Sequence, residues 1–407
     1  MRIWIINHYA LPPTAAGGTR HYNFARQLQE RGHEVLIIAA NFNHFSHSFI
    51  STSKKKAELD TRYEVPFLWL PVPAYKGNTL ARFWNMLVFM RAVLRNKLLL
   101  SLTPPDIILG SSPHLFAAFG AALLAKRMKK PFILEVRDLW PDSLVELGRF
   151  THKHPLIIMM KWLERSLYKR AEQLISLLPS AKEYFIQHGV KAENITWLPN
   201  SVDVSAIPEE AFRFPNNEKF TVMHAGAHGL ANDQDTVLAA ASILQNKGLS
   251  NKIRICLVGD GPEKARLKEQ AAREGLQMLE FIDSVPKKQI YGILQQADAF
   301  LMLLKDSPVF RWGISPNKLF DYLAMERPVI FAVSTPFNPI EQAQAGISIS
   351  PSDPEALARA IEDLAKTSKD KLQMMAKRGK AYVLEHHDLS RLSQVFEGLM
   401  MKYVSVP

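Results

Sequence analysis

The stretch of residues 310–332 holds residue types that together could bind a phosphorylated ligand. Its pattern predicts a turn-rich loop over 313–317 and a helix over 318–325. The first turn of a helix presents unpaired backbone N–H groups and the positive end of its dipole, so it attracts anions. Lys318 adds a positive charge, and Asp321, one turn further on, could accept hydrogen bonds from hydroxyl groups. The combination favours a ligand such as a nucleotide sugar, although an ordinary helix start with both side chains in water fits this stretch equally well.

A glycine doublet, Gly17-Gly18, lies between an expected first strand at residues 2–7 and an expected helix at residues 19–31. A second strand at residues 34–39 would complete a β-α-β opening. Glycine lets the backbone come close to a phosphate or a sugar, although turns use glycine for many other reasons. The doublet lacks the G-x-G-x-x-G spacing of nicotinamide dinucleotide sites, so such a cofactor is poorly supported.

Arg137 and Asp138 follow an expected strand at residues 132–136. Side chains at the carboxyl ends of parallel strands meet the ligand in an α/β sheet. The pair is therefore a second candidate site, with a structural salt bridge as the equally weighted alternative. No metal site is expected, because residues 386–388 (His-His-Asp) fit a helix cap better than a set of ligands.

Alternating strands and helices surround these candidates and must position them. In the first half the expected strands are 106–110, 132–136 and 173–178, the expected helices are 113–128 and 154–171, and residues 41–80 are expected to be irregular. The alternation pauses between residues 198 and 217. It resumes with strands at 221–225, 253–258, 279–282, 299–303 and 329–332 and helices at 233–245, 263–274, 287–297 and 318–325. The sequence therefore predicts an α/β protein with two Rossmann-like, doubly wound domains.

The positive charge of the chain lies in its first half. The net charge is +11, and residues 1–180 hold 24 of the 50 Lys and Arg but only 12 of the 39 Asp and Glu. Such asymmetry points to nucleic acid, an anionic membrane surface or a phosphate-bearing substrate. An expected helix over residues 80–100 and a second at 154–170 carry basic and aromatic residues together, which suits a membrane interface, although a core helix with a basic outer face is as good an interpretation. The basic residues of the first helix are Arg82, Arg91, Arg95 and Lys97.

Other features set the expected class and compartment. The single cysteine, Cys256, cannot form an internal disulfide. We expect no signal peptide at the start, and no apolar run has the length of a transmembrane helix. A cytoplasmic protein is therefore expected.

Six motifs in order along the chain resemble those of a known family. They are Gly17-Gly-Thr-Arg-His-Tyr, Val136-Arg-Asp-Leu-Trp-Pro-Asp-Ser-Leu, Leu198-Pro-Asn-Ser-Val-Asp, Gly226-Ala-His-Gly-Leu, Val258-Gly-Asp-Gly-Pro-Glu and Ser315-Pro-Asn-Lys-Leu-Phe-Asp-Tyr-Leu-Ala. Together they resemble the family-4 retaining glycosyltransferases with the GT-B fold, especially the bacterial branch that builds O-antigen, capsule or other surface polysaccharides.

The resemblance implies two Rossmann-like domains that face an interdomain cleft. Residues 1–200 would bind the acceptor, with 384–407 packing on them through a C-terminal helix, and residues 201–383 would bind a nucleotide sugar. The implied reaction is metal-independent transfer of a sugar, with retention of configuration, to a glycan on a polyprenyl diphosphate at the inner face of an anionic membrane. A UDP-sugar with an N-acetylated or 6-deoxy hexose is the favoured donor, and no cofactor is expected.

The resemblance also implies roles for individual residues. Asp321 would hold the ribose hydroxyls, and the segment containing Asp283 and Val285 would meet the nucleobase. Asp138 would orient the acceptor or the donor sugar, with Arg137 near a phosphate and Lys318 stabilising the leaving diphosphate. The remaining donor contacts would be Gly17, Gly18, Gly226, His228, Gly229, Ser315, Pro316, Asn317 and Leu319.

The sequence departs from the family pattern in three ways. Gly313 stands where the family has the first glutamate of its E-x7-E motif, and Asp321 stands at the second. The arginine and lysine that neutralise the diphosphate align with Ala227 and Asn232, so His228 or Lys318 would take over part of that work. The family's frequent His-Asp pair appears here as Arg137-Asp138.

Two other functions remain open on the sequence alone. A sugar-nucleotide epimerase shares the two-domain architecture and would act on its donor without an acceptor. A basic nucleic-acid-binding protein would explain the charge, although no recognisable nucleic-acid-binding motif supports it.

Overall fold

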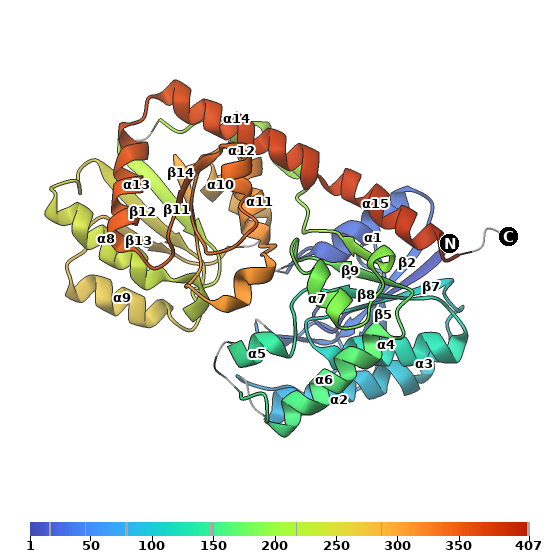
Figure 1. Ribbon diagram of the computed structural model, residues 1–407. Coiled ribbons are helices and arrows are strands. Elements are labelled where there is room, and N and C mark those ends of the chain that lie inside the picture. The colour runs from blue at the N-terminus through green and yellow to red at the C-terminus, as the bar shows by residue number, and fades with distance from the viewer. Residues whose placement is uncertain are drawn as a thin grey trace. The chain divides into compact units, whose positions relative to one another are not determined.

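The computed structural model describes residues 1–15, 18–44, 46–77, 80–146, 148, 150–216, 218–285 and 287–404 (Figure 1). The chain divides into two compact units. The first unit consists of Met1–Pro199, Trp312–Ser315 and Leu389–Pro407, and the second consists of Asn200–Arg311 and Pro316–Asp388. Each unit is a Rossmann-like α/β body, as the sequence predicts. Among the described residues, no helix is long and apolar enough to cross a membrane.

The first unit contains an eight-stranded sheet in the order β10-β9-β8-β7-β1-β2-β6-β5. All neighbouring strands are parallel except β5 and β6. The strands are β1 (Arg2–Ile6), β2 (Glu34–Ala40), β5 (Glu58–Asp60), β6 (Phe67–Leu70), β7 (Ile107–Ser111), β8 (Phe132–Val136), β9 (Gln173–Ser176) and β10 (Ile195–Trp197). Apolar side chains alternate between the two faces, so helices must cover both.

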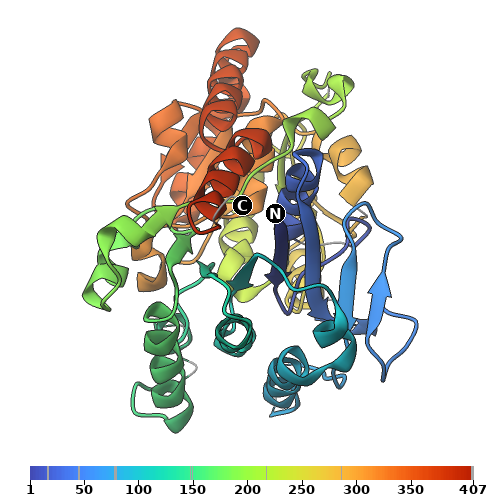
Figure 2. The ribbon, with the colours of Figure 1, turned by 90° about the vertical axis from the view of Figure 1, so that its right-hand side faces the viewer.

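One face of this sheet is covered by α2, α4 and α6, and the other by α1 and α15. On the second face, helices from opposite ends of the chain pack together, with the rings of Phe24 and Phe396 5.2 Å apart (Figure 2). The helices of the unit are α1 (Arg20–Glu30), α2 (Leu80–Arg95), α3 (Lys97–Ser101), α4 (Leu115–Met128), α5 (Asp142–Glu146), α6 (Pro155–Tyr168), α7 (Lys182–Gln187) and α15 (Leu389–Met401).

Residues 41–80 are not irregular, and this expectation was wrong. β6 is the second strand from one edge of the sheet, where it pairs with β2 in parallel and with β5 in antiparallel orientation. Each of its four side chains is 0% exposed. A small hairpin, β3 (Phe42–Asn43) and β4 (Ser48–Phe49), precedes it. A strand buried on both faces shows no polar alternation, and the prolines on either side, Pro66 and Pro71, leave a run of only four residues to recognise.

The expected long helix over residues 80–100 is in fact two helices. Asn96 interrupts it, because its side-chain oxygen accepts a hydrogen bond from the Leu99 backbone N–H at 3.1 Å and caps the start of α3. Asparagine is a preferred residue at this position because it satisfies one of the unpaired donors of the new helix.

The second unit contains a six-stranded, wholly parallel sheet in the order β13-β12-β11-β14-β15-β16. Its strands are β11 (Phe220–Ala225), β12 (Ile253–Val258), β13 (Leu279–Ile282), β14 (Ala299–Leu303), β15 (Val329–Ala332) and β16 (Gly346–Ile349), and its helices are α8 (Gln234–Asn246), α9 (Lys264–Arg273), α10 (Lys287–Leu294), α11 (Asn317–Ala324), α12 (Pro339–Ala343), α13 (Pro354–Lys366) and α14 (Lys369–His386). β12 to β15 have the bounds that the sequence predicts. β16 was not predicted, and its four residues are only partly buried at the sheet edge.

Candidate functional site

In each sheet the order of the strands reverses next to its first strand. The reversal lies between β1 and β7 in the first unit and between β11 and β14 in the second. Loops leave the sheet in opposite directions at such a point, so the carboxyl ends of the two strands open a crevice in which α/β proteins bind ligands.

In the second unit, Tyr322 attaches α11 to the end of β11. Its hydroxyl group donates to the Ala225 carbonyl at 2.8 Å and accepts from the Ala225 N–H at 2.7 Å, and its ring stacks on Phe300 of β14 with centroids 4.2 Å apart. These contacts set the first turn of α11 beside the loop that follows β11. Pro316 is the N-cap residue of that turn, and its side chain makes no capping hydrogen bond. The role of Tyr322 was missed, since its motif shows only an aromatic residue on a helix.

Lys318 lies at the centre of this arrangement. Its ammonium group donates to Asn232 Oδ1 at 2.6 Å, and the Asn232 amide donates to the Ala227 carbonyl at 3.0 Å. A Cβ atom on Gly226 would lie 3.4 Å from Lys318 Cδ, so the backbone of the β11 loop packs directly against the lysine. Lys318 is therefore held in place by Ala227 and Asn232, which stand at the two positions where the family pattern has an arginine and a lysine.

The pKa of Lys318 lies well below the ordinary value for a lysine. Part of its side chain is open to solvent, yet the protein around the ammonium group removes enough water to lower its pKa to about 7. A lysine that is half charged near neutral pH gains a full charge when an anion binds beside it. Perturbed lysines of this kind are common at functional sites.

The loop after β12 fixes the backbone of His228 in the loop after β11. The His228 N–H donates to the Asp260 carbonyl at 2.8 Å, and the His228 carbonyl accepts from the Glu263 N–H at 3.0 Å. Gly261 permits this approach, because a Cβ atom there would lie 2.3 Å from the His228 carbonyl oxygen. Burial lowers the pKa of His228, so its ring is neutral.

Other predicted donor residues of the second unit lie on the same edge of its sheet. Gly229 follows His228, and Val285, half-buried, follows β13. Asp283 is 88% exposed at its side chain and pairs with Lys264 at 2.6 Å, which lowers the pKa of the carboxyl group. Asp321 lies on α11. Burial is the main cause that raises the pKa of Tyr291 on α10, and the negative charge of Asp321 adds to it. Asn317 is the first residue of α11, and Leu319 is a buried residue of the same helix.

The position of the missing family glutamate has a structural reason. Gly313 has φ +93°, and a Cβ atom on it would lie 2.5 Å from the ring carbons of Pro179. The neighbouring Trp312 carbonyl accepts from the Ser180 N–H at 3.0 Å. Residues 312–315, which include Ser315, therefore pack within the first unit, and no side chain fits at position 313.

In the first unit, Gly18 lies two residues before the start of α1, whose N-cap residue is Thr19, and Gly17 lies outside the described residues. Arg137 and Asp138 follow β8, and the Arg137 N–H donates to Ser112 Oγ at 2.8 Å. Asp138 is exposed, although the protein around its carboxyl group raises its pKa and Arg137 opposes that rise. Both residues therefore lie at a strand end, as predicted.

Beneath these strand ends lies a buried polar cluster that was not predicted. Glu135 on β8 accepts from Arg20 Nε at 2.8 Å, from Ser111 Oγ at 2.7 Å and contacts His21 Nε2 at 2.9 Å. Burial alone would raise the pKa of Glu135, but Arg20 and His21 outweigh it and hold that pKa well below its usual range. The cluster joins the start of α1, which follows the glycine loop, to the ends of β7 and β8.

Carboxylate and histidine side chains do not gather into a metal site in the part of the chain that the structure describes. Asp233 and Asp235 are two residues apart but diverge. Asp233 accepts from Thr236 and Ser352, both at 2.9 Å, while Asp235 pairs with Arg266. His387 is buried after α14, where its ring stacks on Phe320 of α11 with centroids 3.6 Å apart.

Two family models match the chain. The glycosyl transferase 4-like domain matches residues 16–201, and the glycosyl transferases group 1 domain matches residues 219–367. WcaI of Escherichia coli, a glycosyl transferase named for colanic acid biosynthesis, is 26% identical over 274 residues and 63% of this chain. The chain spans about two thirds, 65%, of the length of that relative.

Two solved structures share the fold across nearly the whole chain. Sucrose-phosphate synthase of Thermosynechococcus elongatus has a TM-score of 0.77 at 15% identity, with 98% of each chain covered. HepE of Anabaena in complex with UDP-glucose has a TM-score of 0.71 at 15% identity, with 99% of this chain and 100% of that chain covered. Together with the two matching glycosyl transferase models, the two Rossmann-like units define a protein of the GT-B glycosyltransferase class. Within that class, the chain belongs to the family-4 glycosyltransferases.

Proposed function

We propose that this protein transfers a sugar, with retention of configuration, from a nucleoside diphosphate to a lipid-linked glycan in the biosynthesis of a bacterial surface polysaccharide. The observation that carries the proposal is the group formed by Lys318, Asn232 and Gly226 at the strand reversal of the second unit. It combines a cation, an uncapped helix start and a closely approaching backbone. A diphosphate leaving group needs this chemistry, because negative charge grows on it during transfer.

The donor would bind along the edge of the second unit. Lys318 and the first N–H groups of α11 would stabilise the diphosphate, assisted by the loop that contains Gly226, His228 and Gly229. Asp321 would accept hydrogen bonds from the ribose, and the segment of Asp283 and Val285 would meet the base. Since a cation and helix dipole already lie at this position, we propose that the reaction needs no metal. The complex of HepE with UDP-glucose supports a uridine nucleotide for this chain.

The acceptor would bind to the first unit. Asp138 would orient the acceptor hydroxyl or the donor sugar, Arg137 would lie near a phosphate group, and Gly18 would let the backbone of this unit approach the donor phosphate. A polyprenyl diphosphate carrying the glycan is the proposed acceptor, and the name of WcaI, a glycosyl transferase of colanic acid biosynthesis, supports a polysaccharide as the product.

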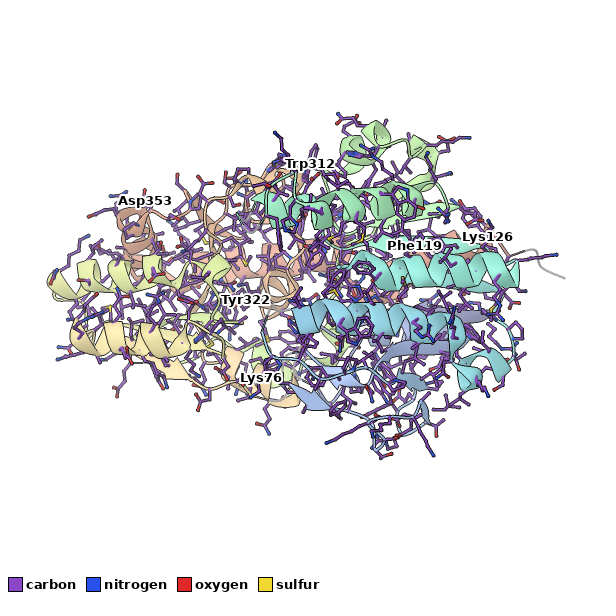
Figure 3. All side chains as sticks on the ribbon, turned by 90° about the horizontal axis from the view of Figure 1, so that it is seen from below. Lys76, Phe119, Lys126, Trp312, Tyr322 and Asp353 are labelled. Carbon is purple, nitrogen blue, oxygen red and sulfur yellow. The ribbon has the colours of Figure 1, made fainter. Side chains whose placement is uncertain are left out.

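We further propose that the first unit attaches to an anionic membrane surface. α2 and α6 lie on either side of α4 (Figure 3), and Trp84 and Trp162, one from each outer helix, are both 60% exposed. Arg91 and Arg95 on α2 are exposed as well. Exposed tryptophans beside basic residues are typical of helices that lie in a membrane interface. The protein would then act at the cytoplasmic face of the membrane.

Incubation with a panel of UDP- and GDP-sugars, with and without a synthetic lipid-diphosphate glycan, tests the proposal. We expect release of nucleoside diphosphate and a labelled glycan that both require the acceptor, in the presence of EDTA. Conversion of the donor to its epimer without acceptor would instead identify an epimerase. Binding of nucleic acid with no binding of any sugar nucleotide would contradict both enzymatic functions.

A further inference from the structure

Glu164 on α6 has a buried carboxyl group for which the proposed function has no use so far. The residue is 2% exposed. Its Oε1 atom lies 2.8 Å from the hydroxyl group of Tyr168, on the same helix, and 2.8 Å from that of Tyr184, on α7. The Tyr184 hydroxyl group also lies 3.0 Å from Asp142 Oδ2, on α5. Three oxygen–oxygen contacts of hydrogen-bond length therefore join side chains from three helices of the first unit.

These three contacts need three protons. Oxygen atoms at this separation have a hydrogen atom between them, and one hydroxyl proton serves one such contact. The two tyrosines supply two protons. An ionised carboxylate only accepts hydrogen bonds, so the third proton must belong to a carboxyl group. Either Glu164 or Asp142 is therefore protonated when all three contacts are formed.

The surroundings favour Glu164 as the protonated partner. Asp142 Oδ1 lies 3.0 Å from the ammonium group of Lys161, and this ion pair favours the ionised form of Asp142. Burial raises the pKa of Glu164, and the negative charge of Asp142 adds to the rise. The hydroxyl groups oppose it only in part, as does His188, whose ring stacks on that of Tyr184 with centroids 4.2 Å apart.

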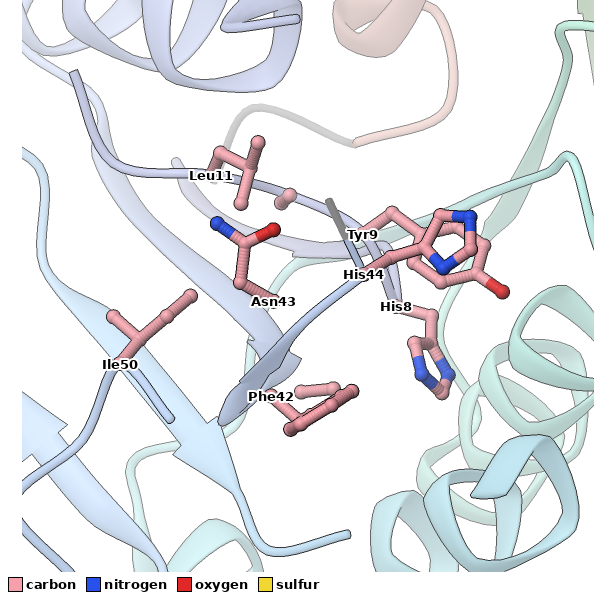
Figure 4. A pocket seen from close by; sticks show the side chains of 9 residues that line it. His8, Tyr9, Leu11, Phe42, Asn43, His44 and Ile50 are labelled. Carbon is pink, nitrogen blue, oxygen red and sulfur yellow. The ribbon is translucent and has the colours of Figure 1, made fainter. Parts of the chain in front are cut away.

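Burial favours the neutral form of histidines in the same unit, with the opposite result for the proton. His8 and His44 line a hollow between the loops after β1 and β2 that has no room for a water molecule (Figure 4). Burial lowers the pKa of His8 to about 3 and that of His44 to about 4, so both rings are neutral because they lack a proton. A carboxyl group is neutral when it keeps its proton, so the same cause leaves Glu164 protonated.

Tyr184 connects this cluster to the segment of residues 312–315. Its ring packs against that of Trp312 with centroids 5.6 Å apart. The Trp312 carbonyl accepts a hydrogen bond at 3.0 Å from the N–H of Ser180, two residues before α7 begins. The segment belongs to the first unit and ends at Ser315, a predicted donor contact. The position of Tyr184 therefore bears on that of Ser315.

We propose that Glu164 is a positioning residue that acts in its protonated form. Its carboxyl group donates to the Tyr184 hydroxyl group, which donates in turn to Asp142, and this chain fixes the ring of Tyr184 against Trp312. In alkaline solution Glu164 loses its proton to the solvent. Two negative carboxylates then compete for the one proton of Tyr184, so the ring is no longer fixed and residues 312–315 lose part of their support.

Infrared spectroscopy of the full-length protein tests the proton and needs no substrate. A protonated carboxyl group has a C=O stretching band that a carboxylate lacks. At neutral pH, the difference spectrum between the unchanged protein and Glu164→Gln should contain this band, and the band should be lost in alkaline solution. The matched control is Glu183→Gln at an exposed position on α7, whose difference spectrum should contain carboxylate bands only.

Quenching of Trp312 fluorescence by acrylamide tests the positioning. The signal of Trp312 is the difference between each protein and the same protein with Trp312→Phe. Quenching should increase in the unchanged protein over the alkaline range in which the infrared band is lost. It should stay constant in Glu164→Gln, whose neutral amide both donates and accepts, and it should be high at every pH in Glu164→Leu, which can do neither. Circular dichroism checks that each variant is folded.

A difference spectrum of Glu164→Gln without the C=O band would overturn the inference, and so would quenching that depends on pH equally in folded Glu164→Gln and the unchanged protein. Only the consequence for Ser315 rests on the proposed function, and calorimetry with UDP tests it separately. Weaker binding of UDP to Glu164→Leu than to Glu164→Gln supports that consequence, and equal binding contradicts it. If UDP binds to neither variant nor the unchanged protein, the proposed donor is wrong, while the infrared result still decides where the proton lies.

Discussion

Arg20 on α1 and Glu135 on β8 form an ion pair in which both side chains are 2% exposed, although 115 residues separate them in the sequence. Arg20 also donates to the Leu198 carbonyl at 3.0 Å, which lies directly after β10. One guanidinium group therefore fixes the start of α1, the end of β8 and the exit of β10 relative to one another. Gly18, a predicted donor contact, and Arg137, a predicted catalytic residue, are each two residues away from this pair.

Breaking the Arg20–Glu135 pair should destabilise the first unit strongly. In Glu135→Gln the buried guanidinium keeps its charge and loses its carboxylate, and such changes cost about 3–5 kcal/mol. Urea unfolding measures the difference. Glu34→Gln breaks an ion pair with Arg2 in which Glu34 is 71% exposed, and it should cost less than about 1 kcal/mol. Equal losses in the two variants would contradict the inference.

The same pair should contribute to the acid sensitivity of the protein. The pKa of Glu135 lies well below its ordinary value, so its contribution to stability is present above about pH 4.3, the value of an unfolded glutamate, and is lost as the pH falls toward the folded value. The slope of stability against pH in this acidic range should be smaller in Glu135→Gln. An unchanged slope would mean that the carboxyl group titrates normally.

Binding of UDP should weaken as the pH rises through 7. The diphosphate attracts the protonated form of Lys318, and the pKa of about 7 means that this form disappears from the free protein above that pH. Isothermal titration calorimetry between pH 6 and 8.5 should show Kd rising by up to about tenfold per pH unit at the upper end. The guanidinium group of Lys318→Arg stays charged over this range, so the part of the pH dependence of Kd that comes from position 318 should vanish in that variant.

Removing the charge at position 318 should have a larger effect than removing a surface charge. Lys318→Ala should weaken UDP binding by about tenfold or more, because a charge-assisted hydrogen bond contributes about 1.5–3 kcal/mol. The control is Lys247→Ala, on the same unit, where the side chain is 45% exposed. If both variants bind UDP like the unchanged protein, the start of α11 is not the donor site.

Restoring the family glutamate at position 313 should harm the protein. Gly313→Glu and Gly313→Ala both place a Cβ atom 2.5 Å from Pro179 and force a side chain into a left-handed backbone conformation. We expect a loss of about 1–3 kcal/mol or more in urea unfolding. Gly292→Ala in α10 meets nothing within 4 Å and should be neutral or stabilise the protein by up to about 1 kcal/mol. Full stability of Gly313→Ala would contradict the described conformation.

Anionic vesicles should bind the protein through the basic face of α2 and α3. Arg91, Arg95 and Lys97 are exposed, and each charge near such a surface contributes about 1 kcal/mol, so replacing all three by Ser should reduce co-sedimentation at low salt by roughly 100-fold. Arg82 is left intact because it contacts Tyr9. The matched control replaces Lys54, Lys55 and Lys56, which are exposed elsewhere on the first unit. Equal binding by all three proteins would reject the membrane surface.

The sequence predicts strands best where burial leaves an unmistakable pattern. β12 to β15 are short segments in which most residues are apolar, and their bounds were predicted to the residue. β6 escaped prediction because its stability comes from β2 and β5 on either side rather than from a pattern of its own. A strand whose stability depends on the strands beside it can be recognised only when the pairing of the whole sheet is known.

In the candidate site, too, local features could be predicted from the sequence and contacts between distant residues could not. Lys318 and Asp321 could be predicted because a helix start and its charges are local in sequence. The pairing of Glu135 with Arg20, and that of Gly313 with Pro179, could not, because each joins residues more than 100 positions apart. The absence of a glutamate at position 313 was visible in the sequence, but the proline that excludes it was not.

The contact of α15 with α1 has a consequence during synthesis. The first unit lacks its last helix until residue 401 has been made, so Phe24 and the neighbouring apolar surface that Phe396 covers stay uncovered on the ribosome. At about 5–20 residues per second, the roughly 200 residues between the first sheet and α15 take about 10–40 s to appear. The nascent chain is therefore a candidate client for chaperones throughout that interval.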